Sequence, residues 1–520
     1  MQHPVPAATG SAGMVCSIDG RASEAGIRML AEGGNAVDAA VAAAAVLAVV
    51  APNTCGMGGD LFALVGTGEG APLCLNASGR APSGASAERL RLEGHRAMPR
   101  LRHPAAVTVP GCVDGWLALH ARLGAMNLPE VLGAAHAFAA DGFTASAELA
   151  AAAGDVAGAD GNTDIPGDLR AGDAVRRPGS ARALEAIATG GRDAFYGGEF
   201  GDGLLGLADG LFSPDDLATP MADWVEPATV EAWGHRLWTV PPNSQGYLIL
   251  AAAALAQGLD LPADPDDADW AHWLIEAARA VGSFRPGELS DAADMAALLD
   301  PVRIDGLRRR VLAGDTPVTP PADGGDTTYL CAADDRLSVS LIQSNAMGFG
   351  SLLVSGGTGI FLHNRGLGFS LDPAHPACYA PGRRPPHTLS PALATTLDGR
   401  NRAVLGTMGG DAQPQVVLQM LARLLHCGQS PAETLGAGRW VLRGPDAFAT
   451  WTPRWLPPVA LEPHAPAAWA DGLAARGHNV AALDDNPKLT GHAHLIEVTP
   501  DGTLSGAAEP RTALAAAIAV

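Results

Sequence analysis

The feature that most constrains the fold of this chain is a change in the pattern of apolar and polar residues between residues 326 and 327. After this point, short stretches alternate apolar and polar residues, which is typical of strands. A sheet-rich segment cannot fold easily without helices to cover it. We therefore predict that 1–326 and 327–520 form one structural domain. Before the boundary, helical patterns recur around 114–124, 128–140, 181–190 and 268–281.

The boundary itself is marked by a linker and a hairpin. The linker, 313–326, is dominated by Pro, Gly and Asp. The strings TTYLCAA and RLSVSLIQS follow it and flank the turn Asp334-Asp335, which predicts a β-hairpin. Thr327 therefore ends a linker and opens a strand.

One buried helix is predicted near the N-terminus, over 33–51. Asn35 can cap it, Asp38 complements its dipole, and Pro52 stops it. The Gly-rich string CGMGGD (55–60) follows. It lacks the Lys-Ser/Thr ending of a nucleotide loop and precedes a predicted strand, LFALVG, so a phosphate-binding loop is not favoured.

Composition and charge exclude several classes of protein. The net charge of −21 would repel phosphate backbones, so we expect no nucleic-acid partner. Seven cysteines without a CxxC pair predict neither a disulfide framework nor a metal site. The longest apolar run, Ala39 to Ala51, is shorter than the roughly 20 residues that span a bilayer. With no evident signal peptide, we expect a cytoplasmic protein without a membrane partner and without a cofactor.

Thr327 occupies the position that a self-cleaving nucleophile requires. Its hydroxyl could attack the carbonyl of Asp326 and form an ester that water opens. The freed α-amine would then act as general base for the same hydroxyl. The alternative is that a Thr pair opening a strand reflects β-propensity alone.

Gly409 and Gly410 lie in GTMGGDAQPQ, where a predicted strand turns into a helix. Two consecutive glycines allow backbone N–H groups to approach a developing oxyanion without a side chain in the way. The alternative is a tight strand-to-helix turn with no catalytic role.

Ten segments, in order, resemble the γ-glutamyltranspeptidase family. The resemblance implies an α+β fold, the four-layer αββα sandwich of N-terminal-nucleophile hydrolases. It implies a large subunit, 1–326, and a small subunit, 327–520, that remain each other's partners after cleavage. It also assigns Thr327 as nucleophile and Gly409 and Gly410 to the oxyanion hole, and a homodimer of the processed heterodimer is a further expectation. The segments are GGNAVDAAVA, CGMGGD, VPGCVDGW, AFYGGEF, VPPNSQG, GDTTY, FGS, GRRPPHTLSP, GTMGGDAQPQ and GAAEPR.

The chain departs from the family where a glutamyl substrate would bind. The arginine that grips the α-carboxylate falls on Ser78, in NASGRAP, and the neighbouring glutamate on Gly79. Arg80, two residues later, could supply the cation if it lies on the same strand face; the alternative is a structural arginine. The acidic residue that holds the α-amine falls on Gly368.

Three further positions complete the expected substrate site. The family's serine pair falls on His387 and Thr388, and its asparagine falls on Asn345 if one residue is inserted. His387 could instead be a satisfied structural histidine. Loss of a charged partner in a pocket costs several kcal/mol, so efficient γ-glutamyl transfer is not expected.

These variants resemble the family branch of non-glutamyl amidases that includes oxamate amidohydrolase. We therefore expect hydrolysis of a small amide or acyl amide through an acyl-enzyme. The alternatives are a γ-glutamyltransferase or glutathione hydrolase, a cephalosporin-type acylase, and, outside enzymes, an unprocessed scaffold protein.

Overall fold

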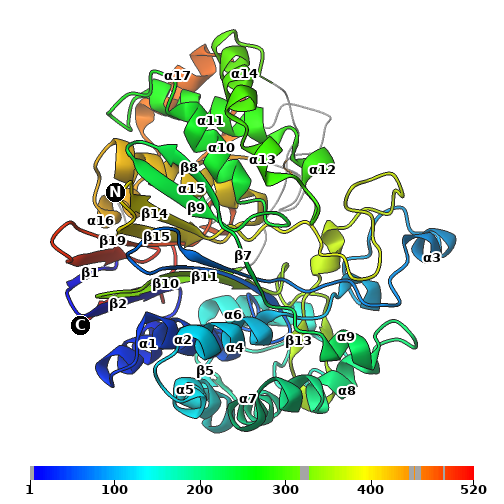
Figure 1. Ribbon diagram of the computed structural model, residues 1–520. Helices are drawn as coiled ribbons and strands as arrows, with labels where there is room; N and C mark the ends of the chain where they lie inside the picture. Colours follow the sequence, from blue (N-terminus) through cyan, green and yellow to red (C-terminus); the bar gives the residue numbers. More distant parts are fainter. Residues whose placement is uncertain (1–4, 317–326, 444–449, 451–457, 484–486) are drawn as a thin grey trace.

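Two β-sheets lie face to face at the centre of the protein, and helices cover both outer faces (Figure 1). The structure, a computed structural model, describes residues 5–316, 327–443, 450, 458–483 and 487–520. The layer order is helix, sheet, sheet, helix, which confirms the predicted α+β class and the four-layer αββα sandwich.

The first sheet has seven strands and is covered by helices, most of which are drawn above it in Figure 1. The helices are α10 (Tyr247–Ala256), α11 (Ala268–Gly282), α14 (Pro301–Leu312), α15 (Gln413–Leu421), α16 (Pro431–Gly436) and α17 (Ala467–Ala475). The strands, in spatial order, are β1 (Ala7–Gly10), β20 (Leu504–Ala507), β19 (Ala493–Val498), β15 (Asn401–Thr407), β14 (Ala392–Thr396), β9 (His235–Thr239) and β8 (Ala228–Ala232).

The second sheet also has seven strands, and its helices lie below it in Figure 1. These are α1 (Gly20–Ala31), α2 (Ala36–Val50), α4 (Cys112–Leu123), α5 (Leu128–Asp141), α6 (Ala147–Ala152) and α7 (Pro178–Tyr196). The strands, in spatial order, are β21 (Ala516–Ala519), β2 (Gly13–Ser17), β10 (Thr328–Asp334), β11 (Ser338–Ser344), β3 (Asp60–Gly66), β4 (Leu73–Ala77) and β7 (Asp223–Val225).

Smaller elements complete the periphery. The short helices are α3 (Ala87–Leu92), α8 (Glu199–Leu205), α9 (Pro214–Ala218), α12 (Arg285–Glu288) and α13 (Met295–Leu298). The short strands are β5 (Phe143–Thr144), β6 (Ala174–Val175), β12 (Leu353–Val354), β13 (Phe361–Leu362), β16 (Trp440–Leu442), β17 (Val459–Leu461) and β18 (Val480–Ala482). Among the described helices, none combines the length and apolarity needed to traverse a bilayer.

Each sheet takes strands from both sides of the 326/327 boundary. In the first sheet β9 pairs with β14, and in the second β3 pairs with β11. The buried apolar residues form one cluster between the sheets and one large cluster between each sheet and its helices. Neither part of the chain could therefore bury its strands without the other.

Local sequence signals near the N-terminus are confirmed. The helix predicted over 33–51 is α2, and the Asn35 side chain accepts hydrogen bonds from the N–H groups of Val37 and Asp38. All of its residues are buried, because it packs against α1, α5 and the sheet. CGMGGD leads into strand β3 rather than a helix, as predicted.

Candidate active site

Thr327 lies immediately before β10, on the face of the second sheet that meets the first. Side chains alternate along a strand, and Tyr329, Cys331 and Ala333 belong to the core between the sheets. Thr327 shares their parity and is 1% exposed. The residue sits at the end of the inter-sheet layer, where the strand begins.

The predicted hairpin brings Ser344 to Thr327. In β10 and β11, Thr328 pairs with Gln343, so the next residues out, Thr327 and Ser344, lie opposite each other. Their hydroxyl oxygens are 3.0 Å apart. The N–H of Ala346 donates to Ser344 Oγ at 2.8 Å, and Nη2 of Arg365 donates to it at 3.3 Å. Either hydroxyl can be the donor of the bond between Thr327 and Ser344, and the contact holds the two oxygens together.

A chain of hydrogen bonds continues from Arg365 toward the first sheet. Nη1 of Arg365 donates to Thr388 Oγ1 at 3.0 Å. The Gln245 side chain amide donates to the carbonyl oxygens of Thr388, at 2.9 Å, and Gly410, at 3.0 Å. The Thr327 hydroxyl and the glycine turn therefore belong to one buried polar network.

Gly409 and Gly410 form the turn between β15 and α15. Their φ angles are +121° and +57°, a region that L side chains rarely adopt. Within the described ranges, the N–H groups of both glycines are left without a backbone acceptor. This is the arrangement expected of oxyanion donors, although a strand-to-helix turn alone would also require glycine here.

A cavity of about 340 Å³ opens beside the network. Gly368, which ends the short helical turn that Arg365 begins, and Pro386, which precedes His387, line it. Arg285 also lines it and pairs with the Asp411 carboxylate at 3.1 Å, next to Gly410. The cavity is thus connected to the hydrogen-bonded chain through residues that neighbour Arg365, His387 and Gly410.

Asp60 provides a buried negative charge in the next strand. Asp60 pairs with Ser344 across β3 and β11, and the Asp60 Oδ1 atom accepts a hydrogen bond from the N–H of Gly79 at 2.8 Å. His387 Nε2 lies 3.1 Å from Oδ2 and His363 Nδ1 3.5 Å from it. Burial alone would raise the pKa of Asp60, but His363, His387 and the Arg365 charge outweigh it and hold the pKa well below its usual range.

His387 is a structural histidine in this geometry. It is fully buried, its Nδ1 accepts the Leu389 N–H at 3.3 Å, and its Nε2 faces Asp60. Burial and the Arg365 charge lower the pKa of His387 to about 3. Both ring nitrogens are engaged, which favours the alternative to a substrate-binding role.

The buried His387 predicts a pH-dependent stability. Between pH 6.5 and about 3 the unfolded chain binds a proton at this residue that the folded chain does not. The free energy of unfolding should therefore decrease as the pH is lowered through that window, by about 1.4 kcal/mol per pH unit for one such group. In His387→Gln, unfolding free energies measured across this window should show a shallower slope. An unchanged slope would contradict the prediction.

Ser78 faces Asn243 and Arg384 rather than open space. Its hydroxyl donates to Asn76 Oδ1 at 2.9 Å and accepts from Asn243 Nδ2 at 3.1 Å, and Arg384 Nη1 lies 3.3 Å from it. The Arg384 guanidinium also pairs with Asp223 at 2.7 Å. A buried arginine thus occupies the neighbourhood in which the family places its own.

Two glycines close the positions of the family's acidic side chains. A Cβ on Gly79 would lie 1.9 Å from the Val109 carbonyl oxygen, and a Cβ on Gly368 would lie 2.5 Å from that of Pro386. Neither position can accept a side chain without a backbone shift. An acidic side chain that would bind a γ-glutamyl substrate therefore does not fit at either position.

Arg80 does not lie on a strand, contrary to the expectation. Strand β4 ends at Ala77, before it, and the Arg80 guanidinium pairs with Asp223 at 2.8 Å and donates to the Gly382 carbonyl. Within the described ranges, its guanidinium forms no hydrogen bond or ion pair with Thr327 or Ser344. The strand that was expected to turn Arg80 inward ends three residues too early.

The structure places the remaining predicted residues as follows. Asn345 directs its amide Nδ2 to the Pro52 carbonyl at 3.1 Å, so it holds the loop after α2. Thr388 belongs to the hydrogen-bonded chain. Asp326 and most of the predicted linker 313–326 lie outside the described residues.

Sequence reasoning missed Ser344, Asp60 and Gln245. For Ser344 a signal existed, because counting outward from the Asp334-Asp335 turn sets Ser344 opposite Thr327. Asp60 ends CGMGGD and Gln245 lies in VPPNSQG, so two of the family segments contain these residues, but nothing in either string indicates that its polar side chain joins the network around Thr327.

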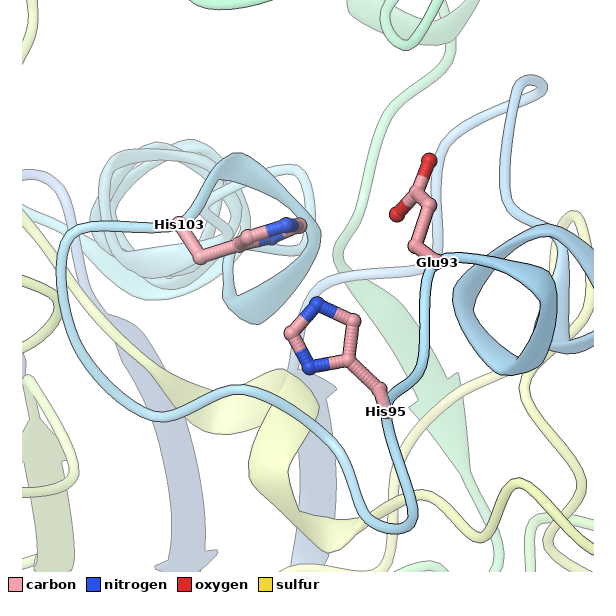
Figure 2. A group of neighbouring side chains, drawn as sticks. All are labelled: Glu93, His95 and His103. Carbon is pink, nitrogen blue, oxygen red and sulfur yellow. The ribbon is translucent and has the colours of Figure 1, made fainter.

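Two groups of side chains among the described residues could hold a metal ion. Figure 2 shows the first, Glu93, His95 and His103, on and near the loop that follows α3. Nδ1 of His103 accepts the Ala105 N–H at 3.2 Å, which places the ring proton of a neutral His103 on Nε2. To bind a metal ion through Nε2, that proton would have to move to Nδ1, and the bond to Ala105 would break.

The second group consists of His272, Glu276 and His478, and the guanidinium of Arg279 already lies against it. Arg279 Nη1 lies 2.8 Å from His478 Nδ1 and 2.9 Å from the Glu276 carboxylate. Within the part of the chain that the structure describes, neither group is hydrogen-bonded to the Thr327 network.

The αββα sandwich, with a hydroxyl residue at the inner start of a central strand, is the architecture of the N-terminal-nucleophile hydrolases. The Gamma-glutamyltranspeptidase family model matches residues 22–519. The chain belongs to the γ-glutamyltranspeptidase family, which confirms the resemblance drawn from its motifs.

Known relatives match over nearly the whole length. The oxamate amidohydrolase proenzyme of Klebsiella pneumoniae is 35% identical, covering 97% of this chain and 98% of its own. The glutathione hydrolase-like YwrD proenzyme of Bacillus subtilis is 33% identical, covering 96% and 97%. The crystal structure of cephalosporin acylase from Bacillus halodurans has a TM-score of 0.89 at 32% identity, covering 99% of this chain and 97% of that chain.

Proposed function

We propose that this chain is a self-processing amidohydrolase in which Thr327, as an N-terminal nucleophile, hydrolyses a small oxamate-like amide. The observation that supports this best is the pairing of the Thr327 and Ser344 hydroxyls at 3.0 Å within a network that reaches Gly410. The similarity to oxamate amidohydrolase supports the choice of substrate.

Maturation would begin at the peptide bond that precedes Thr327. The Thr327 hydroxyl attacks the Asp326 carbonyl carbon, the C–N bond breaks, and the acyl group moves from nitrogen to Oγ1. Water then opens the ester and leaves a free α-amine on Thr327. Because both sheets interleave strands from each fragment, the two fragments would stay together as a heterodimer.

In turnover, the α-amine takes the proton from the Thr327 hydroxyl as Oγ1 attacks the amide carbonyl. The N–H groups of Gly409 and Gly410 would hold the oxyanion. The C–N bond breaks, the amine leaves with the proton, and an acyl ester remains on Thr327. Water hydrolyses that ester and releases the acid.

A glutamyl substrate is disfavoured by the geometry of the site. Its carboxylate and ammonium would have to find partners where Ser78 is already bonded and Gly368 has no room for a side chain. An unpaired charge inside a pocket is costly. A smaller acyl group avoids that cost.

The test is a comparison of substrates with purified, processed protein. We expect ammonia release from oxamate, with a kcat/KM at least about 100-fold above that for a γ-glutamyl anilide. The lost charge contacts at Ser78 and Gly368 are the physical reason. Turnover of the anilide at about 10 per second would instead indicate a γ-glutamyl enzyme.

An acylase for bulkier amides is the second candidate. The similarity to a cephalosporin acylase favours it, and the cavity of about 340 Å³ beside Gly368 and Pro386 has room for a larger acyl group. Faster release of the amine from a cephalosporin-type amide than of ammonia from oxamate would select this function.

A further inference from the structure

Glu93, His95 and His103 bring three possible metal ligands together around one loop. Figure 2 shows the Glu93 carboxylate and the two imidazole rings turned toward a common space. One ligand atom from each residue lies within 4.8 Å of the other two. The rings of His95 and His103 stand edge to face, with centroids 5.2 Å apart. Two imidazoles and one carboxylate suit Zn²⁺ better than Mg²⁺ or Ca²⁺, which prefer oxygen ligands.

The backbone fixes both ends of this loop. Glu93 is the C-terminal cap of α3, and the N–H of His95 donates to the carbonyl of Leu90 at 3.0 Å. At the other end, His103 caps the turn Pro104–Ala106. The three side chains are therefore presented close together by the fold, so little conformational entropy is lost when they bind an ion.

Each of the three side chains can be released at a small cost. Glu93 lies 3.9 Å from Arg89, and both side chains are about half exposed, so their ion pair contributes little. In the described part of the chain, the imidazole of His95 forms no hydrogen bond. His103 would lose its bond to the Ala105 N–H, which corresponds to about a factor of ten in affinity.

The surrounding charges and the number of ligands set the expected affinity. Five arginines occur between residues 89 and 102, and like charges oppose the binding of a cation. Three protein ligands leave the fourth position of a tetrahedral Zn²⁺ ion to water. We therefore expect a Kd of about 1–10 μM, weaker than that of a structural zinc site with four protein ligands.

We propose that Glu93, His95 and His103 form a Zn²⁺ site that fastens the end of α3 to the body of the protein. Helix α3 stands out from the body (Figure 1). His103, in contrast, begins the turn Pro104–Ala106, which packs against the turn Arg365–Gly368. An ion held by all three side chains would join these two parts.

The loop that the ion would fasten forms part of a cavity wall. Arg96 and Ala97, the two residues after His95, line the cavity of about 340 Å³ beside Gly368. A bound ion would therefore hold this wall in one position. The site uses no residue of the Thr327 network, so it does not depend on the proposed function.

A Zn²⁺ titration of the purified full chain, after treatment with a chelator and dialysis, tests the site. Competition with a chromophoric indicator would measure the Kd and the number of ions bound. We expect His95→Ala to weaken binding by at least about 100-fold, because even the partners of metal ligands commonly change affinity by about 10–100-fold. His95 is partly exposed, so this variant should fold.

Two further variants separate the loss of a ligand from other effects. His103→Asn keeps a side-chain acceptor for the Ala105 N–H, because asparagine is a good cap, but it removes the imidazole. It should weaken binding by at least about tenfold. His272→Ala changes the second group of possible ligands and should leave the affinity of this site unchanged.

Trypsin cleavage after Arg96 would report whether the ion fastens the loop. Arg96 is exposed, and cleavage there requires the loop to open locally. With Zn²⁺ at ten times its Kd, the cleavage rate of the wild type should fall by at least about fivefold. The rate for His95→Ala at the same Zn²⁺ concentration should not change, which controls for any effect of Zn²⁺ on trypsin.

The possible outcomes decide the inference without an activity assay. Absence of binding at millimolar Zn²⁺ would overturn it, and so would binding that is lost in His272→Ala but kept in His95→Ala. Two bound ions in the wild type, falling to one in His95→Ala, would support it. Binding at this site with unchanged trypsin cleavage would overturn the fastening of the loop.

Discussion

Replacing Thr327 with alanine is expected to leave an intact chain of 520 residues without amidase activity. Both maturation and turnover use the hydroxyl that the substitution removes, so activity should fall by at least about 10⁴-fold. A denaturing gel would report processing, and ammonia release from oxamate would report turnover. Splitting of this variant at 326/327 would refute the nucleophile assignment.

Thr327→Ser is the matched control for that experiment. It keeps the hydroxyl and the contact with Ser344 but loses the methyl group that restricts χ1. It should therefore still split into two fragments, more slowly than the wild type. A serine variant as inert as the alanine variant would point to a defect in folding rather than in chemistry.

Gly409→Ala should lower kcat on oxamate by about 100-fold, the size of effect seen when one oxyanion donor is lost. The alanine cannot easily keep a φ of +121°, so the N–H groups of the turn would rotate away from the oxyanion. KM should change less than kcat, because the contact forms mainly in the transition state. Steady-state kinetics on the processed fraction would measure both.

Gly33→Ala separates strain from catalysis. Gly33 also has a positive φ, +96°, and a Cβ there would meet nothing within 4 Å. The residue follows α1, in the outer helical layer, so its substitution should cost stability without changing kcat. If both variants lose kcat alike, the glycine turn has no special role at the oxyanion.

The sequence by itself determined the elements that depend on neighbouring residues. The cap at Asn35 and the alternation through the Asp334-Asp335 turn are local signals, and the structure confirms the helix and the hairpin. The class and family could also be predicted, because the motifs stand in one order along nearly the whole chain. The position of Thr327 at the start of a strand followed from the same patterns.

Only the tertiary structure decided where the arginines around the site lie. Arg80 is nearer in sequence to the family's arginine position, but β4 ends at Ala77 and the side chain turns to Asp223. Arg365 lies 21 residues after Ser344, and the folding of the intervening segment brings its guanidinium to the end of β11. An ion pair such as that of Arg80 with Asp223 joins segments 143 residues apart, and a linear sequence contains no distance between them.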